Sequence, residues 1–262
     1  MPETFDEKSV YRYLHTPDLH ITVLSEVTST NTLLAQEAQK GAPEGTVLAA
    51  HCQSGGRGRL GRSFASPKDG GLYFTLLLRP SFAPADAARL TPACAVAMAR
   101  AIENTCAVSP QIKWVNDLYL HNRKICGILT EATPDKYGQK LDYVLIGIGT
   151  NIYPADESLP AELAAKAGTI FPAKPEIDYR ARILAAFLDE FFTIYPNLSH
   201  AKLYQAYKER LFIIDKPVYV THGNEKYNAQ VIGLNEDFSL LVRTAAGDIK
   251  NLSSGEISLK LL

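Results

Sequence analysis

Three arginines lie close together in the glycine-rich segment from Gln53 to Arg62, and they are the strongest chemical signal in this chain. Guanidinium groups are permanently charged, forked hydrogen-bond donors that suit carboxylates and phosphates. The glycines between them let the backbone approach a ligand closely. The segment therefore predicts a loop that encloses an anion.

The glycine spacing also matches two nucleotide-binding patterns. Gly56, Gly58 and Gly61 fit the dinucleotide fingerprint, and the same stretch nearly fits the P-loop. Both patterns need a helix that begins at the last glycine, so that its N-terminus meets the phosphate. Pro67 and a pair of glycines follow instead, and they exclude a helix there. We therefore reject both interpretations.

Two further segments carry polar groups that have a structural and a functional interpretation. Ser29, Thr30 and Asn31 precede a helical pattern, so they either cap a helix or hydrogen-bond the polar head of a ligand. The run from Lys113 to Asp117 holds a cation, the only tryptophan and a carboxylate. Its two charges form either a solvated pair or part of a site, while the tryptophan is expected to anchor the core.

Lys124 begins an otherwise apolar strand pattern, and strand alternation would place it on one face with Cys126 and Ile128. Burying an unpaired ammonium is costly, so Lys124 either reaches solvent or meets a buried anion. Gly127 in the middle of this strand indicates that something approaches its backbone.

A later apolar run ends in Gly147-Ile148-Gly149-Thr150-Asn151. Alternating glycines would leave one face of a strand bare. The pattern indicates either a bulge or tight packing, or a flat floor for a ring system with Asn151 at its edge.

The elements that must position these residues are predicted from periodicity and turn signals. Strands are expected at 19–25, 46–51, 72–78, 123–131 and 141–152, and helices at 28–40, 86–106, 179–195 and 200–211. After about Phe212, five short β-like runs separated by turn signals predict a small barrel. We therefore expect an α+β protein with a catalytic domain at 1–212 and a β-barrel domain at 213–262.

The composition describes an ordinary globular protein, with 262 residues, 46% hydrophobic content and a formal net charge of −1. No global basic field recruits nucleic acid or a membrane surface, and no signal-like or transmembrane run is visible. The four cysteines show no CxxC spacing, which excludes a zinc site and a disulfide frame. They indicate reduced core thiols of a cytoplasmic protein.

Taken together and in this order, the motifs resemble the catalytic domain of biotin protein ligases. The segments that carry the resemblance are Ser-Thr-Asn before a helix, Gln53 with Gly-Arg-Gly-Arg-x-Gly-Arg, Lys-Trp-x-Asn-Asp, Lys-x-x-Gly-Ile-Leu-x-Glu and Gly-Ile-Gly-x-Asn. The resemblance runs from about Ser25 to Leu262. It implies a mixed-sheet catalytic domain of the class II synthetase and biotin ligase type, followed by a small C-terminal SH3-like β-barrel.

This resemblance implies a ligase that uses ATP and Mg²⁺ as co-substrates to activate biotin as biotinyl-5′-AMP. The acyl group then passes to a lysine of a biotin carboxyl carrier domain, for example that of acetyl-CoA carboxylase. The resemblance assigns catalytic roles to Arg59, Lys124 and Asp117, with no protein metal site. It assigns binding of biotin and its adenylate to Ser29, Thr30, Asn31, Gln53, Gly56, Arg57, Gly58, Arg59, Arg62, Lys124, Gly127, Gly149 and Asn151.

The chain also departs from the family pattern. Phe64 stands where tryptophan is common, Val115 replaces a usual proline, and Lys260 stands where arginine is common, which puts a phosphate contact there in doubt. Because the catalytic pattern begins by about Leu19, we expect a short form without an N-terminal DNA-binding domain and no binding of nucleic acid.

Three alternatives stay open at this stage. A lipoate or octanoate transferase of related fold would share the acylated-lysine product, and Cys126 would be its candidate nucleophile. A biotin sensor without catalysis would not need cations aimed at phosphates. A homodimer is possible if the strand Gly147–Ile152 has a free edge.

Overall fold

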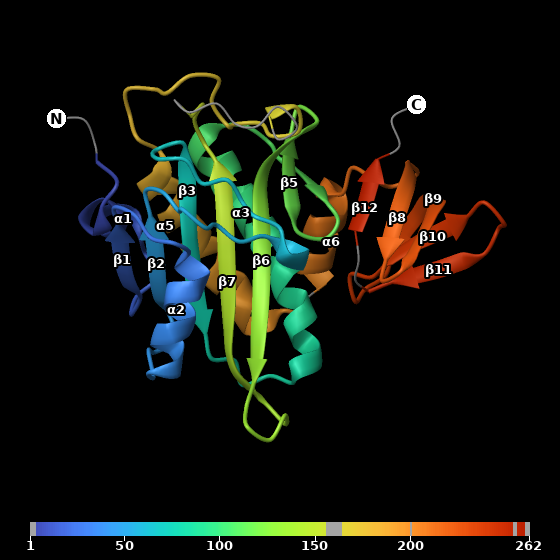
Figure 1. The fold of residues 1–262 in the computed structure, drawn as a ribbon, viewed down its shortest axis with the longest axis horizontal. Helices are drawn as coiled ribbons and strands as arrows, with labels where there is room; N and C mark the ends of the chain where they lie inside the picture. Colours follow the sequence, from blue (N-terminus) through green and yellow to red (C-terminus); the bar gives the residue numbers. More distant parts are fainter. Residues whose placement is uncertain (1–3, 156–163, 200, 254–255, 260–262) are drawn as a thin grey trace.

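The structure is a computed structural model that describes residues 4–155, 164–199, 201–253 and 256–259. Two β-sheets organise these residues, one of seven strands and one of five (Figure 1). Most of the helices pack against the larger sheet, so the α+β class is confirmed. Among the described residues, no helix combines the length and apolar character needed to cross a bilayer.

The larger sheet is mixed and has the order β1-β2-β3-β7-β6-β5-β4. Its strands β1 and β2 are parallel, and every other neighbouring pair is antiparallel. The strands are β1 (His20–Leu24), β2 (Thr46–Ala50), β3 (Gly71–Leu78), β4 (Gln111–Lys113), β5 (Asp117–Leu120), β6 (Arg123–Pro134) and β7 (Leu141–Asn151).

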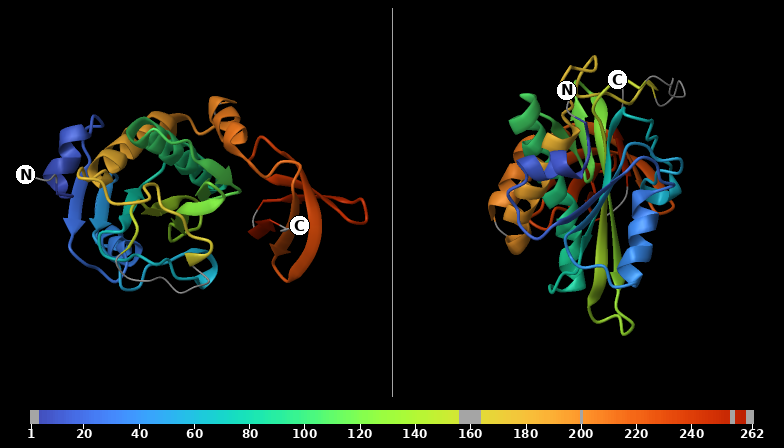
Figure 2. Two further views of the ribbon diagram at one scale, coloured as in Figure 1. Left: turned by 90° about the horizontal axis from the view of Figure 1, so that it is seen from above. Right: turned by 90° about the vertical axis from the view of Figure 1, so that its left-hand side faces the viewer.

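Helices cover both faces of this sheet (Figure 2). The helices are α1 (Glu7–Tyr13), α2 (Thr30–Gln39), α3 (Leu90–Cys106), α5 (Arg180–Ile194) and α6 (Ala201–Arg210). The main core lies under α3 and α5, and the alanine-rich α3 is buried along most of its length. Within the described part of the chain, α2 is the helix that packs on the opposite face, over a small cluster that includes Leu34 and Leu145.

Strand β7 lies in the middle of the larger sheet, paired with β3 on one side and β6 on the other. The free edge on which the homodimer alternative depended is therefore not present at this strand. The outer strand β1 is covered by α1, whose Glu7 and Tyr11 side chains bond its backbone. Strand β4 pairs with Leu211 through an isolated bridge, so both outer strands have partners.

The sequence patterns missed a short helix and a short two-stranded hairpin. Helix α1 has too few apolar residues for a clear period, but a capping box between Asp6 and Ser9 starts it. The run from Lys113 to Asp117 forms the tight connection of the β4–β5 hairpin, and its Trp114–Val115 peptide bond is cis. The hairpin brings this motif to the end of the sheet beside β6.

A register shift between β5 and β6 changes the predicted face of Lys124. Tyr119 pairs with Lys124, whereas its neighbour Leu118 pairs with Cys126, so β6 carries one extra residue there. Lys124 consequently shares a face with Gly127, where an added Cβ would lie 3.2 Å from its Nζ. The prediction that Lys124 and Cys126 share a face is wrong.

The smaller sheet is antiparallel throughout and has the order β11-β10-β9-β8-β12. Its strands are β8 (Pro217–His222), β9 (Glu225–Leu234), β10 (Leu240–Thr244), β11 (Ile249–Leu252) and β12 (Glu256–Leu259). All five β-like runs are confirmed as strands. The exact domain division after residue 212 stays a prediction.

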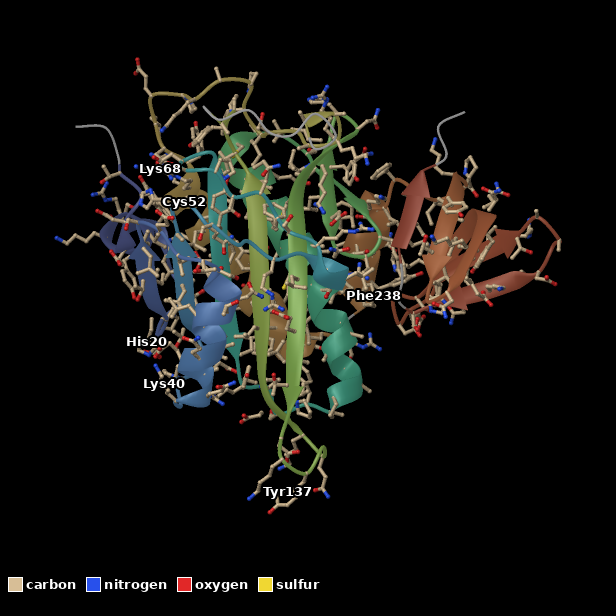
Figure 3. All side chains as sticks on the ribbon, viewed as in Figure 1. His20, Lys40, Cys52, Lys68, Tyr137 and Phe238 are labelled. Atoms are coloured by element: carbon tan, nitrogen blue, oxygen red, sulfur yellow. The ribbon has the colours of Figure 1, made fainter. Side chains whose placement is uncertain are left out.

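The turn between β9 and β10 joins the two sheets (Figure 3). Trp114 Nε1 donates to the carbonyl oxygen of Phe238 at 2.8 Å, and the Phe238 ring lies edge-on to Tyr207. The Tyr204 hydroxyl donates to the Leu234 carbonyl at 2.8 Å. Trp114 is 3% exposed, so its predicted role as a core anchor is confirmed.

Candidate active site

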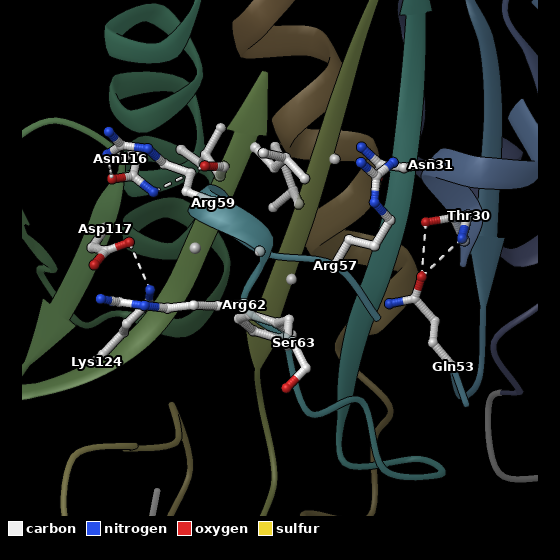
Figure 4. A pocket seen from close by; sticks show the side chains of 18 of the residues that line it. Thr30, Asn31, Gln53, Arg57, Arg59, Arg62, Ser63, Asn116, Asp117 and Lys124 are labelled. Atoms are coloured by element: carbon white, nitrogen blue, oxygen red, sulfur yellow. Dashed lines mark hydrogen bonds and ion pairs between the residues drawn. The ribbon is translucent and has the colours of Figure 1, made fainter. Parts of the chain in front are cut away.

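A cavity of about 190 Å³ lies between the β2–β3 loop and the face of β6 and β7 beside α2 (Figure 4). The loop spans residues 52–68 and is called the arginine loop below. The cavity brings together most residues predicted from the sequence, namely Thr30, Asn31, Gln53, Arg57, Gly58, Arg59, Arg62, Asp117, Lys124, Gly127 and Gly149.

Three predicted residues do not line this cavity. Ser29 is the N-cap of α2, and its hydroxyl accepts from the backbone of Thr32, so its structural interpretation is the one observed. Gly56 lies in the arginine loop, where its carbonyl accepts from Phe64 N. Asn151 ends β7 outside the lining.

One end of the cavity is polar and neutral. Gln53 Oε1 accepts from the backbone N of Thr30 at 2.9 Å and lies 3.1 Å from its hydroxyl. Gln53 Nε2 donates to Ser66 at 2.9 Å, which fixes the orientation of the amide. The Thr75 hydroxyl donates to Asn31 Oδ1 at 2.7 Å. The start of α2 is thereby locked to the sheet, with its polar side chains facing the cavity.

Arg57 lines the cavity and forms an ion pair with Glu131 of β6. Its two terminal nitrogens donate to the two carboxylate oxygens at 2.7 and 3.1 Å. Asn31 Nδ2 donates to the same carboxylate at 2.9 Å. Glu131 does not itself line the cavity, but it orients two residues that do; it was not assigned from the sequence, although it closes the Lys-x-x-Gly-Ile-Leu-x-Glu motif.

The other end of the cavity is cationic. Arg59 Nη1 donates to Asn116 Oδ1 at 2.7 Å, and Lys124 Nζ lies 2.7 Å from Asp117 Oδ1. Arg62 points toward the same end (Figure 4). Asn116, which was not among the site residues predicted from the sequence, is buried and donates to the carbonyl of Ile128 at 3.0 Å. Lys124 therefore meets an anion of the protein, as one of its two interpretations expected.

The floor of the cavity is formed where β7 lacks side chains. A Cβ on Gly149 would lie within 3.0 Å of the Phe64 ring, and one on Gly147 would lie within 3.0 Å of the Asn31 side-chain oxygen. The two glycines therefore leave room for these side chains. Phe64 and Asn31 pack closely against this face, so the tight-packing interpretation is the one observed, and the same two glycines also line the cavity.

The arginine loop contains no α-helix after Gly61, so the rejection of both nucleotide motifs is confirmed. A single 3-10 turn at Arg59–Gly61 carries Leu60, which has a φ of 56° and is 71% exposed. Gly58 N donates to the Arg62 carbonyl at 2.7 Å and closes this turn. The turn presents the flanking arginines to the cavity.

Comparison with known proteins identifies the family. Residues 23–151 match the family model described as the biotin/lipoate A/B protein ligase family. The chain is 30% identical over 244 residues to the bifunctional ligase/repressor BirA of Escherichia coli, covering 92% of this chain and 74% of BirA. The chain belongs to the biotin protein ligase family. It is a ligase enzyme.

Two further relatives support the assignment of this ligase to the biotin protein ligase family. The biotin–[acetyl-CoA-carboxylase] ligase of Paracoccus denitrificans is 28% identical over 239 residues, which cover 86% of this chain and 95% of that protein. The solved biotin protein ligase from Aquifex aeolicus, in complex with biotin and ATP, superposes with a TM-score of 0.72 at 27% identity. That match covers 92% of this chain and 98% of the Aquifex chain.

Two other predictions concern groups outside the cavity. Burial raises the pKa of the Cys126 thiol to about 12, and its sulfur accepts from the Thr150 hydroxyl at 3.3 Å. The ligase therefore holds Cys126 as an inert buried thiol rather than a thiolate nucleophile. Lys260, where a phosphate contact was in doubt, lies outside the described residues.

Proposed function

We propose that this ligase activates biotin with ATP, forming biotinyl-5′-AMP, and then transfers the biotinyl group to a lysine of a biotin carrier domain. The Paracoccus relative named for acetyl-CoA carboxylase supports the choice of acceptor, and the Aquifex structure with biotin and ATP supports both small substrates. The proposed compartment is the cytoplasm, where the free cysteines of the described chain would stay reduced.

The observation that carries the proposal is the division of one cavity into a neutral polar end and a cationic end. A biotin molecule needs hydrogen-bond partners for its ureido ring and cations for its carboxylate. Thr30 and Gln53 lie at the neutral end, and Lys124 and Arg62 lie at the other (Figure 4). A ligand bound lengthwise would therefore place its carboxylate among the cations, next to a bound triphosphate.

The first half-reaction brings two anions together. A carboxylate oxygen of biotin attacks the α-phosphorus of ATP, the bond to the β-phosphate oxygen breaks, and pyrophosphate leaves. Fixed positive charge stabilises the transition state of such a step, because it is already oriented when negative charge develops. We assign this task to Arg59 and Lys124, which Asn116 and Asp117 hold in place.

In the second half-reaction, the amine of an acceptor lysine attacks the acyl carbon of the mixed anhydride, and AMP leaves. The amine must lose a proton during this step. Asp117 is a candidate to accept it, and this role competes with its ion pair to Lys124 at 2.7 Å. Asp117 would thus serve both steps, first by orienting a cation and then by orienting the amine.

Mg²⁺ would arrive with ATP as a co-substrate. The described residues contain no group of three His, Cys, Asp or Glu side chains that could hold a metal ion. Mg²⁺ at nucleotide sites is bound through one or two carboxylates, phosphate oxygens and water. We propose that the triphosphate and water supply most of its ligands.

The test combines the protein, biotin, Mg-ATP and a purified biotin carrier domain, and weighs the carrier by mass spectrometry. We expect the carrier to gain the mass of one biotinyl group, and pyrophosphate to appear with biotin even when the carrier is omitted. A parallel reaction with lipoate tests the transferase alternative. No mass gain, when a known biotin ligase modifies the same carrier, would refute the proposal.

A further inference from the structure

His51 and Asp69 flank the arginine loop near the ends of β2 and β3, and two contacts join them. The backbone N of Asp69 donates to the His51 carbonyl at 3.1 Å, and His51 Nδ1 lies 2.8 Å from Asp69 Oδ1. Cys52 and Lys68, the first and last residues of the loop, lie at the same end of the sheet (Figure 3). The pair therefore closes the base of the loop.

A buried arginine of α5 contacts the base of the loop from the helical layer. Arg180 begins α5, its side chain is 4% exposed, and its Nη1 donates to Asp69 Oδ1 at 2.6 Å. Its Nε donates to the Asp178 carboxylate at 3.0 Å. Burial alone would raise the pKa of Asp69, but the hydrogen bonds from His51 and Arg180 overcome it and lower that pKa to about 2. Asp69 is therefore a carboxylate that accepts from both neighbours.

The same base is tied to two other parts of the fold. His51 Nε2 lies 3.1 Å from the Phe5 carbonyl oxygen, which links the loop to the segment before α1. Gly70, the residue after Asp69, accepts at its carbonyl from Ile152 N at 3.0 Å and from Tyr153 N at 2.9 Å. The returning end of the loop is thereby fixed to the end of β7.

We propose that His51, Asp69 and Arg180 act as a loop clasp, a set of positioning residues that limits how far the arginine loop opens. None of the three lines the cavity, so they act through the loop. A loop with a fixed base has fewer conformations to lose when it closes over a ligand, and the site then retains ligands more tightly. The identity of those ligands rests on the proposed function, but the control of loop opening does not.

The first test compares Asp69→Ala and Asp69→Asn with a matched control, Asp189→Asn. Asp189 also lies on the α5 side of the fold, accepts from His15 at 2.9 Å and has a lowered pKa, but it is not at the loop base. Trypsin cleavage after Arg57, Arg59 and Arg62 is followed by mass spectrometry without biotin or ATP. We expect cleavage to rise about tenfold in Asp69→Ala, because a lost charge-assisted hydrogen bond shifts a local opening equilibrium by about a decade.

A smaller rise is expected for Asp69→Asn and no change for Asp189→Asn. Equal cleavage of the loop in native protein and folded Asp69→Ala would overturn the clasp. Should Asp69→Ala fail to fold, Asp69→Asn decides by the same comparison.

The second test measures pyrophosphate release by the same variants with biotin and Mg-ATP. The KM values for both substrates are expected to rise several-fold in the Asp69 variants, with kcat changed by less than about twofold, since the groups at the reacting atoms are intact. A fall in kcat alone would contradict a positioning role. If the native protein releases no pyrophosphate, the proposed function fails, while the trypsin comparison still decides the clasp.

Discussion

Arg57 and Lys124 each lie 2.7 Å from a carboxylate oxygen of the protein, that of Glu131 and Asp117 respectively. A carboxylate or phosphate of a ligand would compete for the same donors, so binding would exchange one ion pair for another. The protein carboxylates keep both cations pointed at the cavity for this exchange. Single-residue changes should therefore affect chemistry more than folding.

Lys124→Ala tests the cationic end of the site. We expect kcat/KM for pyrophosphate release to fall tenfold or more, because a charge-assisted hydrogen bond contributes about 1.5–3 kcal/mol and each decade needs about 1.4 kcal/mol. Lys250→Ala is the matched control, since Lys250 forms an exposed pair with Glu225 in the smaller sheet. Equal rates in the two variants would remove Lys124 from the mechanism.

Gly149→Ala tests the floor of the site. The added methyl group would meet the Phe64 ring within 3.0 Å, so the ring must move into the cavity or away from it. We expect the KM for biotin to rise about tenfold, the size of a steric penalty of roughly 1–2 kcal/mol. Gly233→Ala, whose methyl group would lie 3.6 Å from Leu241, should leave that KM unchanged.

At the scale of elements, the arginine loop combines a fixed base with an exposed turn. Leu60 at the tip is 71% exposed, while Asp69 at the base holds a buried arginine. None of the residues Arg59–Gly61 at the tip is buried, and local segments with little buried surface open most readily. The element is therefore suited to closing over a reactive intermediate and excluding water from it.

Ligand protection checks this closing movement. With biotin and Mg-ATP, trypsin cleavage between Gly55 and Arg62 should slow about tenfold relative to protein without them, because the ordered loop must open before it is cut. Cleavage near Lys136, at the tip of the β6–β7 hairpin, serves as the internal reference. Equal rates with and without substrates would show that the loop does not close.

The pH dependence of stability follows from the base of the same loop. The pKa of Asp69 is about 2 when folded, against an ordinary 3.8. The charged form is thus favoured by folding, so its contribution is present above pH 3.8 and is lost as pH falls toward 2. This carboxylate is 35% exposed, so solvent screening reduces its contribution to the free energy of unfolding to about 1 kcal/mol.

Denaturant titrations of native protein and Asp69→Asn at pH 6 and pH 2 measure that contribution. The difference in the free energy of unfolding between the two proteins should shrink by about 1 kcal/mol at the lower pH. An unchanged difference would mean that Asp69 does not stabilise the fold through its charge.

At the scale of the whole molecule, the smaller sheet supports one wall of the site. Phe238 accepts from Trp114, a residue that lines the cavity, and Ile257 of β12 lines the cavity as well. Two sheets with separate hydrogen-bond networks therefore build one pocket. Loss of their contact should weaken the fold and the site together.

Tyr204→Phe removes the hydroxyl through which α6 donates to the Leu234 carbonyl of β9 at 2.8 Å, and leaves that carbonyl without this donor. The free energy of unfolding should fall by about 1 kcal/mol, the usual net contribution of such a bond. Tyr227→Phe is the matched control, because the Tyr227 hydroxyl is buried with no hydrogen-bond partner among the described residues. An equal loss in both variants would contradict a bridging role.

The sequence by itself determined which segments carry the chemistry and how each is shaped locally. Ser29 caps a helix as its side chain requires, and Pro67 with paired glycines excluded the helix that nucleotide motifs need. Periodicity placed β6, β7, α5 and the five strands of the smaller sheet within a few residues. These features depend on neighbours along the chain, so local residue types are sufficient to predict them.

Only the tertiary structure decided which residues meet. Arg57 and Glu131 are 74 positions apart, and no local pattern pairs them or selects Asn116 as the partner of Arg59. The order of strands placed β7 in the centre of its sheet, and one extra residue in β6 turned Lys124 into the cavity. Strand order and register are set by packing between distant segments, and periodicity along a single strand carries no information about either.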